Sequence, residues 1–419
     1  MRCPTCGGLL ALEYMPPAKR GKKLQALFDA RLAASTSYSA LEAREVPLDA
    51  SGVWRYRELV LPDAESRDVV TYPEGNTPLL WRRRVAAWCG VEALFMKHEG
   101  ANPTGSFKDR GMTVAVTQAK RIGASAVACA STGNTSASLA AYAAAVDIPA
   151  LVLVPTGQVS LGKLAQSLAY GARTLLVRGD FDDCLRLATE AAAQLGVYLA
   201  NSINPYRLAG QKTIVLELLQ QLRWRAPDWI VLPAGNLGNT SAFGAALRNG
   251  VDLGLIERMP RIAAVQASGA APFAASYRDG FRERHTVRAE TVATAIRIGD
   301  PASYSRAVRV IRETNGVVLD VDDQAILDAK AIVDASGIGC EPASAASIAG
   351  VRELVSRGAI ERGHTVVAVL TGHILKDPGI LLQYHRETVP APAHANPHIE
   401  IAADLREIER VLNTTRQNG

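Results

Sequence analysis

The sequence predicts an α/β protein built on open parallel sheets, and two patterns support this class. Strand-sized apolar runs recur along the chain, and three of them carry the Val and Ile that buried parallel strands favour. Stretches of helical periodicity alternate with these runs, as in repeated β-α-β units. A chain of 419 residues exceeds the usual size of one compact domain. We therefore expect it to divide into two lobes or three.

The expected elements follow this rhythm from residue 72 onward. The predicted strands are 126–130, 150–154, 174–177 and 229–232. The predicted helices are 111–122, 136–145, 161–170 and 181–195, with a last helix at 402–412. Residues 1–70 are predicted to form an N-terminal accessory segment, with a cysteine pair and a basic amphipathic stretch at 19–34.

Composition excludes several classes of protein. Hydrophobic residues make up 48% and charged residues 21% of the chain, which argues against disorder. The net charge is only +5, and no long basic run with interleaved aromatics indicates nucleic-acid binding. The most apolar stretch, 137–155, is interrupted by Asp147 and Pro149, so no membrane span is expected. Without a cleavable signal peptide the chain is expected in the cytoplasm, with its six cysteines reduced.

Lys108 is the first candidate for chemistry. Residues 102–110, Asn-Pro-Thr-Gly-Ser-Phe-Lys-Asp-Arg, read as a turn that runs directly into a helical pattern. The positive end of a helix dipole and partial burial both disfavour an ammonium ion, which would leave a neutral amine able to form a Schiff base. The alternative is a solvated lysine on an exposed helix, and the local pattern does not separate the two.

Two glycine-containing turns each follow a strand and open a helix. In the turn 131–136, Ser-Thr-Gly-Asn-Thr-Ser, free helix amides and hydroxyl groups suit a carboxylate, although the turn could equally be a simple helix cap. In the turn 235–240, Gly-Asn-Leu-Gly-Asn-Thr, the glycines allow a close backbone approach to a phosphate. It lacks the Lys-Ser/Thr ending of a nucleotide P-loop and the spacing of a dinucleotide fingerprint.

Together these segments resemble the signatures of the fold-type II pyridoxal-phosphate enzymes, and they occur in the same order. Further motifs resemble the threonine synthases within that group, at 74–79, 161–172, 201–207, 295–299, 340–346 and 371–378. The resemblance covers about residues 70–385. It implies two open parallel-sheet lobes of the tryptophan synthase β-like type. The large lobe would comprise 71–92 and 206–385 and bind the cofactor phosphate, the smaller lobe would comprise 93–205, and 386–419 would form a C-terminal tail.

The resemblance also implies the reaction and the residues that perform it. The cofactor would be pyridoxal 5'-phosphate, and O-phosphohomoserine and water would give L-threonine and phosphate by γ-elimination and β-addition. The implied catalytic residue is Lys108, which would carry the cofactor as a Schiff base. The implied cofactor-binding residues are Lys108, Phe107, Asn134 at the ring hydroxyl, Gly235, Asn236, Leu237, Gly238, Asn239 and Thr240 at the phosphate, and Thr371 at the ring nitrogen. Because Thr371 is a hydroxyl and not a carboxylate, we expect that nitrogen to be largely neutral.

The substrate would need two anion sites. The implied carboxylate ligands are Ser131, Thr132, Asn134 and Thr135, and the implied phosphate ligands are Ser160, Lys163, Asn204 and Arg207. Lys163 and Arg207 could instead be ordinary exposed charges. The chain also departs from many relatives at Gln158, where they carry Lys, and at Ala209, where they carry Glu. If Gln158 lies near the substrate phosphate, the site has one positive charge fewer than in those relatives, and this weakens the assignment of the phosphate site.

Alternatives remain at this stage. The pair Cys3 and Cys6 has the spacing of a zinc knuckle but supplies two ligands of four, so a structural zinc is a weak prediction and no metal is assigned. His373 reads more as a hydrogen-bonded structural residue than as a proton shuttle. Rival functions are a threonine dehydratase, a synthase acting on O-phosphoserine, or a non-catalytic homologue. A homodimer is what the family suggests.

Overall fold

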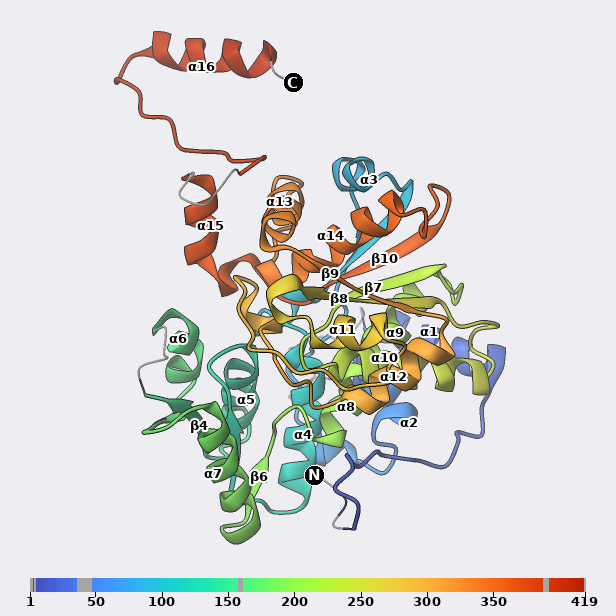
Figure 1. Ribbon diagram of the computed structural model, residues 1–419. Helices are drawn as coiled ribbons and strands as arrows, with labels where there is room; N and C mark the ends of the chain where they lie inside the picture. The colour runs from blue at the N-terminus through green and yellow to red at the C-terminus, as the bar shows by residue number, and fades with distance from the viewer. Residues whose placement is uncertain (1–2, 4, 36–46, 157–160, 387–391, 418–419) are drawn as a thin grey trace.

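The computed structural model describes residues 3, 5–35, 47–156, 161–386 and 392–417, with the side chains of 35, 161–163 and 414–417 left out. The described strands form two sheets, which lie in separate parts of the molecule (Figure 1). The larger sheet has six strands in the order β1-β2-β10-β7-β8-β9, and the smaller has four in the order β5-β4-β3-β6. The predicted α/β class with two open sheets is confirmed.

The elements alternate along the chain much as predicted. The strands are β1 Leu79–Trp81, β2 Ala93–His98, β3 Ala126–Ala130, β4 Ala150–Pro155, β5 Arg173–Val177, β6 Val197–Leu199, β7 Trp229–Pro233, β8 Arg261–Ala267, β9 Val317–Val321 and β10 Thr365–Leu370. The helices of the first half are α1 Gly21–Ser35, α2 Arg57–Val60, α3 Arg83–Cys89, α4 Lys108–Arg121, α5 Asn134–Ala144, α6 Leu161–Ala169, α7 Phe181–Gln194, α8 Pro205–Gln211 and α9 Thr213–Gln221. Those of the second half are α10 Gly238–Asp252, α11 Pro272–Arg278, α12 Tyr304–Glu313, α13 Asp323–Asp334, α14 Pro342–Ser356, α15 Pro378–His385 and α16 Leu405–Gln417.

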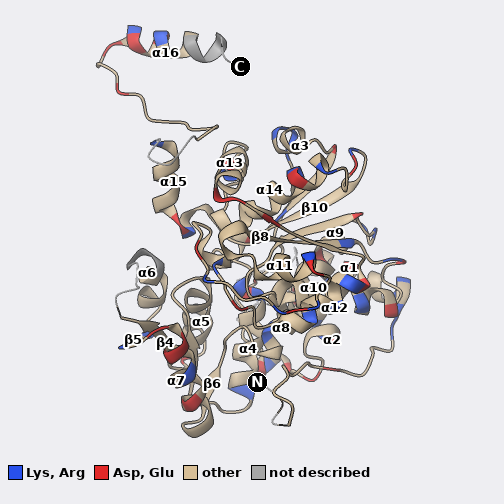
Figure 2. Ribbon diagram, in the orientation of Figure 1, with Lys and Arg blue, Asp and Glu red and all other residues tan. Residues whose placement is uncertain are grey.

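The larger sheet is parallel except at one edge, where β1 pairs antiparallel with β2. The antiparallel edge was not predicted. The sheet is covered on both faces, by α3, α13 and α14 on one and by α9 to α12 on the other. This burial explains why β10 is apolar from Val366 to Leu370 and is drawn without charged residues in Figure 2.

The smaller sheet is wholly parallel and carries α4, α5 and α6 on one face. The other face packs against α7 through Cys184 and Ala188, both fully buried. The turn 131–136 follows β3 and opens α5, as predicted.

The N-terminal segment contributes to the core of the protein. Leu24, Trp54 and Tyr56 are fully buried in one apolar cluster with Val114 of α4 and Leu216 of α9. The indole nitrogen of Trp54 also donates to Thr113 Oγ1 at 2.8 Å. Residues 47–70 therefore brace the helix that begins at Lys108.

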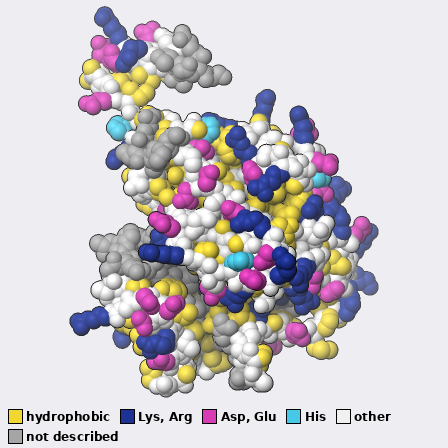
Figure 3. All heavy atoms as spheres, viewed as in Figure 1, with side chains coloured by type: hydrophobic (Ala, Val, Ile, Leu, Met, Phe, Trp, Pro, Cys, Tyr) yellow, Lys and Arg dark blue, Asp and Glu magenta, His cyan; other side chains and the backbone are white. Residues whose placement is uncertain are grey.

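The last helix stands away from the body. Residues 393–396 still bond α13 and α15 through the amides of Ala393, His394 and Asn396, and after them an extended stretch leads to α16, which lies apart from both sheets at the top of Figure 1. Within the described residues, none of the helices has the length and apolar character that crossing a membrane requires. Acidic and basic side chains are interspersed over the face shown in Figure 3.

Candidate active site

Lys108 is the first residue of α4, as the turn before it predicted. Gly105, with φ +82°, completes that turn, in which its amide donates to Asn102 O at 2.8 Å. The next two residues join the end of β10: Ser106 bridges Gly372, and the amide of Phe107 donates to Thr371 O at 3.0 Å. The residues just before Lys108 thus join α4, which packs on the smaller sheet, to the end of β10 in the larger sheet.

The amine of Lys108 is chemically unusual. The side chain is half-buried, and its Nζ lies 3.9 Å from the centroid of the Phe107 ring. Burial and the nearby charge of Arg207 lower the pKa of this amine, Glu341 partly offsets them, and the net pKa is about 7. A substantial fraction of the molecules therefore carries a neutral, nucleophilic amine near pH 7.

A network of buried ion pairs centres on Arg110, two residues after Lys108 in α4. Arg110 donates to Glu99 at 2.7 Å and to Glu217 at 2.7 Å, and Lys97 donates to the same Glu217 oxygen at 2.6 Å. All four side chains are at most 2% exposed. The three cations that face Glu217, with Arg55 the third, hold the pKa of this carboxyl well below its usual range despite burial. Sequence reasoning missed this network, because its members are up to 162 residues apart.

Glu341 is a second group that sequence reasoning left without a role. It is buried immediately before α14, within the motif 340–346. Its carboxylate accepts from Asn134 Nδ2 at 2.9 Å and from Thr371 Oγ1 at 3.2 Å. Burial raises the pKa of this carboxyl above its ordinary value. One acid thus joins Asn134, which was predicted to bind the ring hydroxyl of the cofactor, and Thr371, which was predicted to face the ring nitrogen.

The turn 131–136 is open to a ligand. Ser131, Thr132, Asn134 and Thr135 are all half-buried, and α5 begins at Asn134 after the cap residue Gly133. No side chain caps this helix. Its first amides are therefore available to an anion.

The turn 235–240 presents free amides and buried side-chain oxygens of the kind that bind a phosphate. Leu237 has φ +61° and α10 begins at Gly238, so the first amides of the helix have no intrahelical acceptor. The side-chain oxygens Asn239 Oδ1 and Thr240 Oγ1 are buried without a hydrogen-bond partner among the described residues. A Cβ on Gly235 would lie 3.0 Å from Ile296 Cα, so this position has room only for glycine. Buried hydroxyls and amides without partners are what a bound phosphate would satisfy.

The predicted ligands of the substrate phosphate divide into two groups. Arg207 is 1% exposed, donates to Ala200 O at 3.0 Å and has no acidic partner among the described residues. Burial lowers the pKa of its guanidinium to about 10. Asn204 caps α8, and its amide is bonded to Tyr206 N and Leu199 O. Ser160 and Gln158 lie outside the described residues, as does the side chain of Lys163.

His373 has a structural place beside the site. Its Nδ1 accepts from the amide of Leu375 at 3.2 Å and so caps a short helical turn, Ile374–Lys376. Burial lowers the pKa of the imidazole, which keeps it neutral at pH 7. In the same turn, the amine of Lys376 donates to Gln166 of α6 and so links the two sheets' helices.

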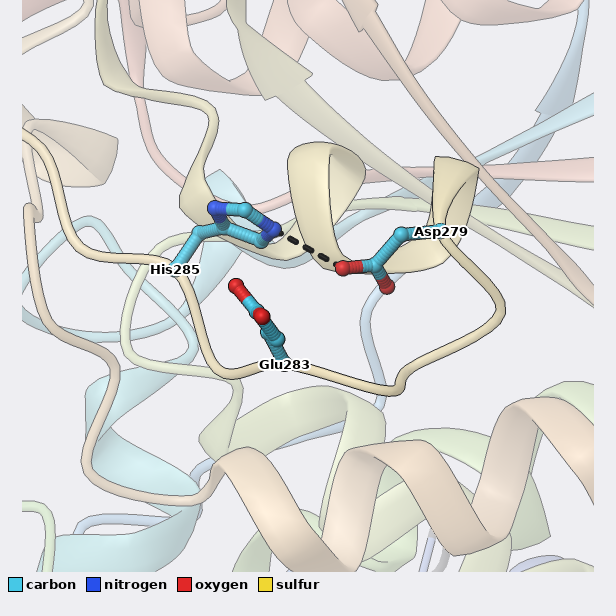
Figure 4. A group of neighbouring side chains, drawn as sticks. All are labelled: Asp279, Glu283 and His285. Carbon is cyan, nitrogen blue, oxygen red and sulfur yellow. Dashed lines mark hydrogen bonds and ion pairs between the residues drawn. The ribbon is translucent and has the colours of Figure 1, made fainter.

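Two other clusters carry side chains that could bind a metal ion. Cys3 is half-buried and Cys6 exposed, and the knuckle is closed by the amide of Cys3 donating to Gly8 O at 2.8 Å. A zinc there stays a prediction. Among the described residues, the one group of three potential ligands within 4.8 Å is Asp279, Glu283 and His285 (Figure 4). Asp279 already bonds His285 Nε2 at 2.9 Å, so this cluster closes the turn after α11.

Comparison with known proteins places this geometry in a family. The model of the family described as pyridoxal-phosphate dependent enzyme matches residues 70–372. A threonine synthase of Methanosarcina acetivorans is 46% identical over 94% of this chain and 92% of its own, and one of Methanocaldococcus jannaschii is 41% identical over 98% of each. The solved threonine synthase of Escherichia coli shares the fold with a TM-score of 0.66, at 19% identity over 98% of this chain and 94% of its own. The family model covers the chain from before the lysine turn to the motif after β10, and the two relatives match 94% and 98% of it. The protein therefore belongs to the threonine synthase family of pyridoxal-phosphate-dependent enzymes.

Proposed function

We propose that the protein is a lyase that converts O-phosphohomoserine and water to L-threonine and phosphate with pyridoxal 5'-phosphate. The observation that carries the proposal is Lys108, a half-buried amine with its pKa near 7 at the start of a helix. An amine in this state can both bond an aldehyde and exchange protons at neutral pH. Family membership narrows the chemistry to threonine formation.

The cofactor would be held at three places. Lys108 would bond its aldehyde with Phe107 packed beside the amine, and Asn134 and Thr371 would contact the ring. The cofactor phosphate would bind residues 235–240, where the buried oxygens of Asn239 and Thr240 support the assignment. Bound in this way, pyridoxal phosphate supplies an electron sink for carbanions formed on an amino acid.

The substrate would be held by its two anions. Its carboxylate would accept from the amides and hydroxyls of the turn 131–135, at the open end of α5. Its phosphate would bind Arg207, because a buried guanidinium without an acidic partner is unfavourable until an anion pairs with it. We assign Ser160, Lys163 and Asn204 to the same phosphate as proposals from the family motif.

Lys108 would then move the protons. With the cofactor bound as an electron sink, the amine of Lys108 would accept one proton at a time, first from Cα and later from Cβ, and would give up the first before it takes the second. Phosphate would leave from Cγ, water would supply the hydroxyl at Cβ, and protons returned to Cγ and Cα would complete threonine. A pKa near 7 suits this work, because the same group must accept and donate protons at one pH.

The assay that tests the proposal compares two products. Release of inorganic phosphate from O-phosphohomoserine, with threonine formed in equal amount, is expected from the purified protein and not from Lys108→Ala. Ammonia release from threonine without phosphate release would identify a dehydratase instead. We further propose that the enzyme acts in the cytoplasm as a homodimer on a small-molecule substrate, without nucleic-acid or membrane partners.

A further inference from the structure

Gln166 of α6 bonds both of the turns that border the proposed cofactor site. Its Nε2 donates to Thr104 O at 3.3 Å, in the turn just before Lys108. Its Oε1 accepts from the amine of Lys376, in the short helical turn that follows Thr371. One half-buried amide therefore joins α6 of the smaller sheet to the lysine turn and to the end of the larger sheet. The family assignment gives no role to Gln166 or Lys376.

Lys376 is itself held in place by the lysine turn. A Cβ on Gly105 would lie 3.0 Å from Lys376 Cε, so the stem of the lysine packs against the backbone of that turn. The amide of Lys376 donates to His373 O at 3.1 Å, and the amide of His373 donates to Gly105 O at 2.9 Å. Burial lowers the pKa of the Lys376 amine, and the nearby charges of Glu341 and Asp109 offset part of this effect. Lys376 is therefore a fixed donor against which α6 can be held.

The position of α6 matters because this helix carries part of the proposed site for the substrate phosphate. Position 163 lies three residues before Gln166, one turn away on the same face of the helix. The other proposed phosphate ligand, Arg207, belongs to α8. On its own side α6 packs against α5 and β5, with Leu164 buried in the core of the smaller sheet. Whether positions 163 and 207 can reach one phosphate therefore depends on where α6 lies.

We propose that Lys376 is a positioning residue for the substrate phosphate, which acts by holding Gln166 and, with it, α6. The inference rests on the proposed function, in which that phosphate binds Arg207 and position 163. Without the bond, α6 would spend less time where both ligands converge, and the apparent affinity for the substrate falls with that fraction. Once the substrate is bound, the arrangement around Lys108 is the same, so KM should change more than kcat.

Steady-state phosphate release from O-phosphohomoserine by the cofactor-loaded full chain gives the first readout. Lys376→Met keeps the length of the side chain but removes the donor, so KM should rise about tenfold while kcat changes by less than about threefold. Lys376→Arg keeps a charged donor and should restore a KM close to that of the wild type. Lys22→Met removes an exposed lysine of α1 and should leave KM unchanged. The Kd for pyridoxal phosphate should be the same in all of these proteins.

A double-mutant cycle distinguishes an effect through α6 from direct binding of the substrate. Gln166→Leu removes the acceptor and should raise KM at least as much as Lys376→Met does, because the bond to Thr104 O is lost as well. If Lys376 acts through Gln166, adding Lys376→Met to Gln166→Leu should raise KM by less than about twofold more. If the two increases multiply instead, Lys376 acts on the substrate itself, and the proposal is overturned.

Hydrogen exchange of the substrate-free protein reads the contact without catalysis. The amides of α6 should exchange faster in Lys376→Met and in Gln166→Leu than in the wild type, whereas those of α7 should keep their rates. Unchanged exchange of α6 in both variants overturns the proposal. A wild-type protein that releases no phosphate from O-phosphohomoserine refutes the proposed function, and the inference with it. An active enzyme whose KM is the same in Lys376→Met refutes only the positioning role.

Discussion

Arg110 lies two residues after Lys108 and forms a fully buried ion pair with Glu217 of α9, with 2.7 Å between Nη2 and Oε1. The same guanidinium bonds Glu99, so one side chain ties α4 to the end of β2 and to α9. Removing one partner of such a pair leaves an uncompensated buried charge. The pair therefore fixes the helix whose first residue is Lys108.

Arg110→Ala should strongly destabilise the protein. Two buried carboxylates lose their principal donor, and we expect the free energy of unfolding to fall by about 3–5 kcal/mol. Denaturant unfolding followed by circular dichroism measures the loss. The matched control is Arg186→Ala, because Arg186 pairs with Asp183 and Glu190 on the exposed face of α7 and should be replaceable without measurable loss. Equal stability of the two variants would show that the buried network does not brace α4.

The reactivity of Lys108 should depend on pH with a midpoint of about 7. Burial lowers the pKa of this amine to about 7, so the neutral form grows as the pH rises from 6 to 8. The rate of covalent cofactor uptake by the cofactor-free protein, read from absorbance, should rise over this range and then level off. A lysine with an ordinary pKa would show a rate that is still rising at pH 9.

The same shift predicts a change in stability with pH. Between about pH 7 and the unfolded pKa of 10.5, the unfolded chain holds a proton at position 108 that the folded chain has lost, so stability from this group rises with pH. Below pH 7 both states are protonated, and the buried charge is fully destabilising. Lys108→Met should therefore raise the unfolding midpoint of the cofactor-free protein more at pH 6 than at pH 9. Lys120→Met, at the exposed end of α4, should show no such difference; a constant gain at position 108 would contradict the lowered pKa.

The sequence predicted the turns of the site better than its charged interior. The starts of α4, α5 and α10 follow from Asn, Gly and Pro chemistry and from apolar periodicity, all of which are local. The bond between Asn134 and Glu341 joins residues 207 apart, and that between Arg110 and Glu217 joins residues 107 apart. Nothing local distinguishes such acids from solvated ones. The only local signal of a buried acid was Glu341, which stands among small residues immediately before a helix.

Thr240 should contribute to cofactor binding without stabilising the empty protein. Its hydroxyl is buried with no partner among the described residues, so Thr240→Val removes an unsatisfied group and should leave the unfolding midpoint equal or higher. The variant loses one hydrogen bond to a phosphate, about 1.5–3 kcal/mol, so the Kd for pyridoxal phosphate should rise at least about tenfold. Thr240→Ser keeps the hydroxyl and should bind nearly as the wild type does. An unchanged Kd in Thr240→Val would place the cofactor phosphate elsewhere.

Arg207→Met should separate substrate binding from cofactor binding. The guanidinium is buried without an acidic partner among the described residues, and we assign it to the substrate phosphate. Losing a charge-assisted bond of about 1.5–3 kcal/mol should raise KM for O-phosphohomoserine by about ten- to a hundredfold, while the Kd for pyridoxal phosphate changes little. Arg207→Lys keeps a charge but loses the bidentate fork, so its KM should lie between that of the wild type and that of Arg207→Met. Steady-state phosphate release measures KM and kcat. If KM is unchanged and only the unfolding midpoint moves, Arg207 serves α8 through its bond to Ala200 O, and the substrate phosphate binds at another cation.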